Sequence, residues 1–248
     1  MANILFCMHL LAYPKFLSHS IYTQTNYLKI LYENYILFYA RSILCERFIV
    51  FSNLFYIYRK GKSAYMQQYT NEFLYELIHS TIKATGLTIM LEEDHSGVNM
   101  SYNFITNIVS FDVTRLVEAA RELASIPFDQ YVKTITLHEL GHAIDRPALD
   151  ASLTRTLDYF EMRDQYSTKE IFKNPDLLGM IIEEHQMNIA FEETAWANAE
   201  NLNQKLQMID QNSFELIKKH SLSTYIRNYE EDLAAYKQLL EKTELQPA

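Results

Sequence analysis

Apolar residues recur at helical spacing along much of this chain. Between residues 70 and 85 they follow the i, i+3, i+4 pattern of an amphipathic helix, and Gly86 stands where a helix C-terminus favours glycine. The same spacing predicts further helices over residues 114–123, 157–165 and 177–204, and in a C-terminal run to about Lys242.

Three short segments read as strands instead: residues 87–91, 98–104 and 108–111. In the second, Val98, Met100, Tyr102 and Phe104 alternate with small or polar residues, as in a half-buried strand. The turn residues of 94–97 and 106–107 separate the three segments. The pattern therefore predicts an α+β fold, mostly helical, with a small β-sheet before a helix that contains residues 131–142.

Residues 1–65 differ in composition from the rest of the chain. They are rich in Phe and Tyr, and Glu33 and Glu46 are their only acids. Such a mixture is what AT-rich DNA encodes without selection, and Arg59-Lys60-Gly61-Lys62 could be a ribosome-binding sequence read as codons. We expect two parts, an atypical hydrophobic segment over residues 1–65 and a folded domain over residues 66–248, with translation starting at Met66. The alternative is a real hydrophobic N-terminal anchor.

Charge and cysteine content narrow the class of protein. The net charge of −9 and the lack of a basic cluster beyond residues 59–62 argue against a nucleic-acid surface. Charged residues interrupt the apolar run from Ile30 to Tyr58, so we expect no membrane partner unless residues 1–65 are an anchor. Cys7 and Cys45 are the only cysteines, which argues against a disulfide framework and favours the cytoplasm.

The sequence His138-Glu139-Leu140-Gly141-His142 is the strongest chemical signal. Residues i and i+4 share one face of a helix, so both imidazoles can bind one Zn²⁺ ion. Glu139 projects beside that face and can take a proton from metal-bound water. Pro127 marks the start of the helix, and Leu137, Gly141 and Ile144 fall on a side of it that we expect to pack into the core. Gly141 disfavours a helix interior, which suggests that another backbone passes close to it.

A catalytic zinc site needs a third protein ligand. The extended motif HExxHxxGxxH is absent, because Asp145 and Ala148 occupy its Gly and last His positions. A Glu from a downstream helix is the remaining common solution, and three residues compete for the role: Glu192, Glu193 and Glu161.

The motif and the segment Glu192-Glu193-Thr194-Ala195-Trp196 together resemble the gluzincin metallopeptidases, whose ligand Glu has a small residue three positions later. They are also similar to the ImmA/IrrE family of phage and mobile-element peptidases, whose site begins with HELGH or HEIGH. The resemblance covers about 35 residues and implies a zincin-like fold with His138, His142 and Glu192 as zinc ligands. Trp196 departs from the pattern, because an Asp or Asn usually stands there and supports a zinc-binding His.

Four further residues are candidates for supporting roles. Asp145, one turn after His142, could accept a hydrogen bond from a metal-bound imidazole. His185, Tyr159 or Tyr166 could stabilise an oxyanion.

These observations predict a zinc metallopeptidase in which Glu139 assists the attack of zinc-bound water on a peptide or protein substrate. The strand near Tyr102–Phe111 could offer its edge to an extended substrate. The alternative is a zincin-like binding or regulatory module with little hydrolytic activity, which would have no need for a general base at position 139.

Overall fold

The computed structural model describes residues 70–244. The expectations for residues 1–65, namely an atypical segment, a start at Met66 or an N-terminal anchor, lie outside the described residues. Within them the chain is mostly helical with one small sheet, as the sequence pattern predicts.

The elements follow one another with short connections. Helix α4 is followed by three strands, and six helices complete the chain. Their bounds are α4 (Asn71–Thr85), β1 (Met90–Glu93), β2 (Met100–Asn103), β3 (Ile108–Phe111), α5 (Val113–Glu122), α6 (Phe128–Ile144), α7 (Arg146–Gln165), α8 (Thr168–Ile171), α9 (Pro175–Leu206) and α10 (Gln211–Glu244).

Two of these helices depart from the sequence expectation. Helix α7 begins at Arg146, eleven residues before the expected residue 157, because Pro147 sits in its first turn, where a missing N–H costs nothing. The expected pattern missed this half of α7 because much of it is exposed and polar. The single turn α8 was also not expected, and its capping box joins Ser167 to Glu170.

Helix α4 begins and ends as its sequence predicts. The Thr70 side chain accepts a hydrogen bond from the Phe73 N–H at the N-terminus. At the C-terminus Gly86 adopts φ 76°, and its N–H donates to the Lys83 carbonyl. The buried face of Leu74, Ile78 and Ile82 joins the main core.

The three strands form one sheet in the order β1-β3-β2, with β1 parallel and β2 antiparallel to β3. The expected strands are right in number, but β1 lies a few residues later than predicted and β2 is shorter. The expectation of a half-buried β2 is wrong, because all four of its residues are buried. Ser101 is accommodated by a hydrogen bond between its hydroxyl and that of Ser110 on β3, 3.1 Å away.

Helix α6 runs through the centre of the domain and is buried on nearly every side from Tyr131 to His142. The sequence expectation placed Ile144 in the core beside Leu137, yet Ile144 is 43% exposed while Leu137 is fully buried. The buried stretch stops at His142, and Ile144 is the last residue of the helix. A helix enclosed in this way has no single apolar stripe, which explains its mixed sequence.

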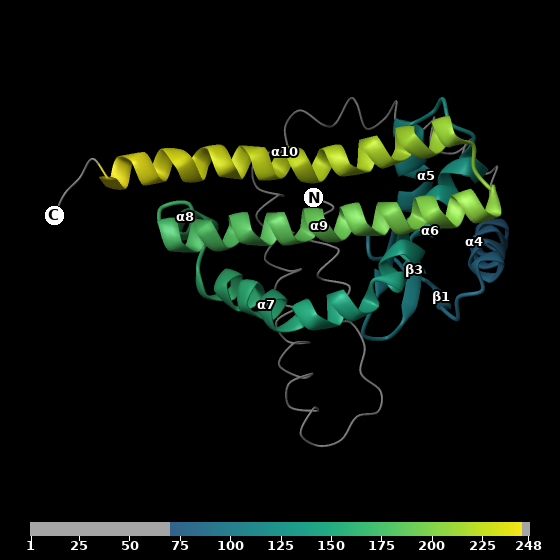
Figure 1. The fold of residues 1–248 in the computed structure, drawn as a ribbon, viewed down its shortest axis with the longest axis horizontal. Coiled ribbons are helices and arrows are strands. Elements are labelled where there is room, and N and C mark those ends of the chain that lie inside the picture. The colour runs from purple at the N-terminus through teal and green to yellow at the C-terminus, as the bar shows by residue number, and fades with distance from the viewer. Residues whose placement is uncertain (1–69, 245–248) are drawn as a thin grey trace, which may run out of the picture.

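Helices α9 and α10 lie side by side over most of their length, and α7 runs along another side of α9 (Figure 1). The sheet, α4, α5 and α6 gather around the C-terminal half of α9, whereas α8 lies at the start of α9. A second, smaller core of Met162, Ile171, Leu178 and Ile181 packs with α10 at that far end.

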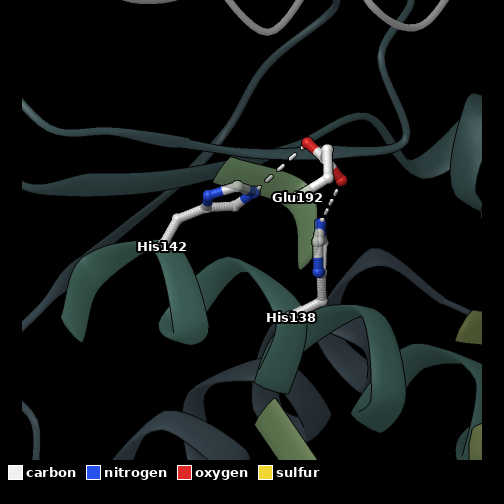
Figure 2. A group of neighbouring side chains, drawn as sticks. All are labelled: His138, His142 and Glu192. Carbon is white, nitrogen blue, oxygen red and sulfur yellow. Dashed lines mark ion pairs between the residues drawn. The ribbon is translucent and has the colours of Figure 1, made fainter. Parts of the chain in front are cut away.

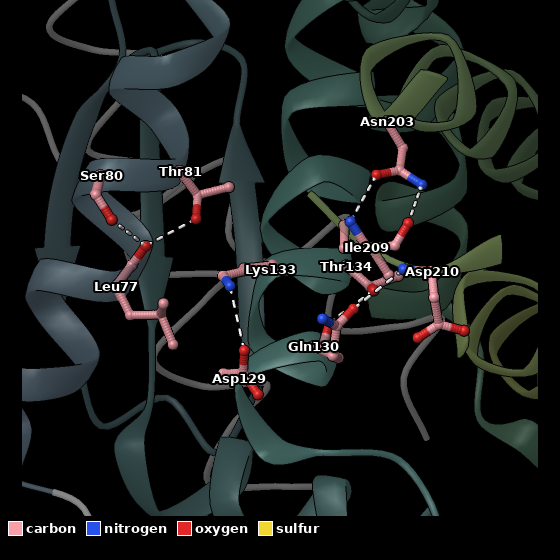
Figure 3. A network of polar contacts seen from close by, with 10 residues as sticks. All are labelled: Leu77, Ser80, Thr81, Asp129, Gln130, Lys133, Thr134, Asn203, Ile209 and Asp210. Carbon is pink, nitrogen blue, oxygen red and sulfur yellow. Dashed lines mark hydrogen bonds and ion pairs between the residues drawn. The ribbon is translucent and has the colours of Figure 1, made fainter. Parts of the chain in front are cut away.

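Hydrogen bonds fix the turn between α9 and α10 against α6 (Figure 3). The Asn203 amide donates to the Ile209 carbonyl at 2.9 Å and accepts from the Ile209 N–H at 3.0 Å. The Asp210 N–H donates to the Gln130 side chain on α6 at 3.3 Å. These bonds set how far α9 extends along α6, and therefore which of its residues face the HExxH motif.

A search of the residues that the structure describes found no helix with the length and apolar character needed to span a membrane.

Candidate metal centre

Three side chains from two helices point toward one another (Figure 2). His138 and His142 lie one turn apart on α6, and Glu192 comes from α9. The Nε2 atom of His138 is 3.2 Å from Glu192 Oε2, and the Nε2 atom of His142 is 3.4 Å from Glu192 Oε1. One ligand atom from each residue lies within 4.8 Å of the others, so the group could hold a metal ion.

The cluster is almost completely shielded from solvent. Exposure is 6% for His138, 1% for His142 and 2% for Glu192. Burial by itself would raise the pKa of the Glu192 carboxyl. The imidazoles of His138 and His142 outweigh that effect and hold the pKa well below its usual range, so Glu192 is an anion facing two nitrogens. An anionic oxygen beside two imidazoles is a donor set suited to a cation.

Glu139 lies next to the cluster but is not one of its three members. Burial raises the pKa of its carboxyl to about 8, and the charge of Glu192 adds to the rise, while His142 and a hydrogen bond from the Tyr102 backbone N–H oppose it. Its Oε2 atom is buried without a hydrogen-bond partner among the described residues. Glu139 therefore has one oxygen held by the sheet and one free to take a proton.

The hydrogen bond to Tyr102 shows that an edge of the sheet faces Glu139. The Asp112 N–H donates to the Asn99 carbonyl, so alternation in the antiparallel ladder makes Ser101 and Asn103 the residues bonded to β3. The N–H and C=O groups of Tyr102 then point to the other side of β2, which is the outer strand in the sheet order.

The backbones of α6 and α9 approach closely at Gly141. A Cβ atom at this position would lie 2.1 Å from the Ala195 carbonyl oxygen, so only glycine fits. This confirms the expectation that another backbone passes near Gly141. The Asn198 side-chain amide donates to the Gly141 carbonyl at 3.1 Å on the same side. Both contacts place Glu192, one turn before Ala195, over the two histidines.

Of the three Glu candidates, the structure brings only Glu192 to the histidines. Glu193 is the next residue on α9 and is exposed, because one step along a helix turns the side chain by about 100°. Glu161 is exposed on α7, where its carboxylate accepts a hydrogen bond from Gln165. Neither residue belongs to the metal-ligand group of the described residues.

The expected hydrogen bond from a metal-binding His to Asp145 is not present. Asp145 lies at the junction of α6 and α7, and no hydrogen bond or ion pair of its carboxylate is found within residues 70–244. The helix ends at this residue, so its side chain no longer follows the helical path back toward His142.

The three candidates for oxyanion stabilisation have other surroundings. The Nε2 atom of His185 lies 2.8 Å from Oδ2 of Asp232 on α10. The Tyr159 hydroxyl accepts a hydrogen bond from Arg155, whose guanidinium also pairs with Glu183. Tyr166 is 40% exposed at the end of α7.

Three features of the site were not expected from sequence: the Tyr102 N–H bond to Glu139, the Asn198 contact with Gly141, and the indole of Trp196 stacked on the His138 ring. Only the Trp196 position had a signal, because it departs from the family pattern. The other two depend on how β2 and α9 lie against α6.

Comparison with protein-family models gave no match, and searches of curated proteins and of solved structures gave none either. The interpretation of the site therefore depends on its own geometry.

Proposed function

We propose that this protein is a zinc-dependent metallopeptidase with His138, His142 and Glu192 as its metal ligands and Glu139 as its general base. The convergence of Glu192 with the two histidines carries the proposal. Glu192 lies on a different helix, fifty residues after His142 in the chain. Its two carboxylate oxygens nevertheless lie 3.2 Å from Nε2 of His138 and 3.4 Å from Nε2 of His142.

The spacing of the donor atoms supports zinc. Ligands at about 2.0–2.1 Å around a tetrahedral ion are separated by about 3.3 Å, close to both nitrogen–oxygen distances in the cluster. Two imidazoles and one carboxylate are also a common ligand set of catalytic zinc, which leaves the fourth position for a water molecule or the substrate. When bound there, zinc would act as a Lewis acid and make water a better nucleophile.

Glu139 has the properties that a proton carrier needs. It belongs to the same turn of α6 as the two histidines, and its carboxyl pKa of about 8 lies near neutral pH. A nearby dication would lower that raised pKa, so that the carboxylate accepts a proton from the attacking water. The same group then returns the proton to the leaving amine.

Strand addition at β2, which the sequence suggested, is not supported by the surroundings of this strand. All four residues of β2 are buried, and the Tyr102 N–H already donates to Glu139.

The test compares zinc-loaded protein with its Glu139→Gln variant on a peptide library. Gln has nearly the same shape but cannot accept a proton, so the variant is expected to keep stoichiometric zinc and to lose turnover. Cleavage by wild-type protein alone supports the peptidase. Zinc binding without cleavage by either protein would favour the alternative, a binding or regulatory module with a zincin-like site.

A further inference from the structure

The ring of Trp196 lies flat against a candidate metal ligand. Its centroid is 4.3 Å from that of the His138 imidazole, and the planes differ by 25°. Trp196 is fully buried and belongs to α9, one turn after Glu192. The same helix therefore provides both the carboxylate that faces His138 Nε2 and the surface on which the imidazole rests.

The other nitrogen of His138 faces no hydrogen-bond acceptor from residues 70–244. Its Nδ1 atom is buried and has no hydrogen-bond partner among the described residues. A metal-bound His usually donates this N–H to a carboxylate or carbonyl, which fixes the rotation of the ring. The Nε1 atom of Trp196 is likewise buried and unpaired in the described part of the chain. Contact between the two rings is thus face-to-face stacking with no hydrogen bond.

The indole is itself held on its other side. Phe214 of α10 packs edge-on against Trp196, with centroids 5.6 Å apart and an interplanar angle of 82°. The close approach of Ala195 to Gly141 fixes the backbone beside the indole. A rigid indole leaves the His138 imidazole little room to rotate.

We propose that Trp196 is a positioning residue of the metal centre. Its ring face, in place of a hydrogen-bond acceptor, holds the His138 imidazole in the orientation that points Nε2 at Glu192. The inference rests on the metal site of the proposed function but not on hydrolysis. Loss of a group that orients a ligand typically weakens metal binding about 10–100-fold, and the same range is expected here.

Zinc affinity of Trp196→Phe and Trp196→Met, measured by competition with a chromogenic chelator, tests this role. Phe keeps a ring face, so its affinity should stay within about threefold of wild type. Met fills space with a flexible chain but has no ring, so its affinity should fall about 10–100-fold. The visible spectrum of the Co²⁺-loaded protein should change in the Met variant and not in the Phe variant.

Phe111→Met is the matched control, because it removes a fully buried ring of the same core that lies on β3 and packs against Tyr75. It should lower the thermal stability of the metal-free protein yet bind zinc within about threefold of wild type. Trp196→Leu replaces the Met variant if the latter does not fold.

Unchanged zinc affinity without a ring at position 196 would overturn the inference, as would an equal loss in Phe111→Met, which would mark a general effect of core packing. A wild-type protein that binds no zinc would overturn the proposed function as well.

Discussion

Gly141 and Ala195 set the distance between the two helices that carry the candidate metal centre. The Ala195 carbonyl oxygen lies where a side chain at position 141 would begin, 2.1 Å from an added Cβ atom. Backbone occupies that space and cannot rotate away, so the two helices must separate to admit even a methyl group. The position of Glu192 over His138 and His142 depends on that close approach.

Gly141→Ala should therefore destabilise the protein and disrupt the centre. Alanine favours a helix by about 1 kcal/mol relative to glycine, but overpacking typically costs about 1–3 kcal/mol or more. We expect a net loss in the free energy of unfolding, measured with urea in the presence of a chelator, and a lower zinc content by elemental analysis.

Gly179→Ala on α9 is the control for that variant. Its nearest neighbour would be the Tyr236 hydroxyl at 3.5 Å, an ordinary contact. This change should be neutral or stabilise the protein by up to about 1 kcal/mol. Equal effects of the two substitutions would contradict the assigned role of Gly141.

Substitution of Glu192, the proposed third ligand, should have an effect on zinc binding that substitution of its neighbour Glu193 does not have. Glu192→Ala is expected to reduce zinc affinity and activity together, because two histidines leave the ion incompletely held. Glu193→Ala changes an exposed carboxylate one position away and should leave both unchanged. Isothermal titration with zinc measures the difference, and retention of tight zinc binding by Glu192→Ala would assign the third ligand to another residue.

Asn198→Ala should loosen the contact between α6 and α9 without removing a ligand. The lost hydrogen bond to the Gly141 carbonyl corresponds to about 0.5–1.5 kcal/mol of stability, and that carbonyl keeps a 3.3 Å bond from the Asp145 N–H. We expect a small decrease in stability and a modest decrease in zinc affinity. Asn201→Ala, at an exposed position on the same helix, should change neither in the same chemical-denaturation series.

The stability of metal-free protein should depend on pH through Glu139. The folded-state pKa of about 8 lies above the reference value of 4.5, so between these values the unfolded chain ionises while the folded protein keeps its proton. The free energy of unfolding should therefore fall as the pH rises through this window. Glu139→Gln cannot titrate and should show a flatter profile, and parallel profiles would show that the pKa of Glu139 is not raised.

Trp196 should report metal binding optically, because it is the only Trp in the chain and its ring centroid lies 4.3 Å from that of His138. Paramagnetic Co²⁺ should quench its emission in proportion to occupancy, with saturation at one ion per chain. His142→Ala, which keeps the stacked pair but removes a ligand, should abolish that saturable response.

The sequence alone determined the helical motif with His138, Glu139 and His142, since two imidazoles one turn apart follow from helix periodicity. It also indicated a close backbone at Gly141 and the ends of α4, because both depend on local rules for glycine and capping. Helical periodicity was wrong in two places: it started α7 too late, and it placed the exposed Ile144 in the core. In both places solvent exposure, and not local propensity, governs the pattern.

Only the tertiary structure decided among Glu192, Glu193 and Glu161. Their local sequences are all compatible with a helix, and the choice depends on how α9 is rotated and shifted against α6. Contacts between distant segments set that register: Ala195 with Gly141, Asn198 with the Gly141 carbonyl, and Asp210 with Gln130. The stacking of Trp196 on His138 and the Tyr102 bond to Glu139 arise in the same way, because packing across the core, and not spacing along the chain, brings those groups together.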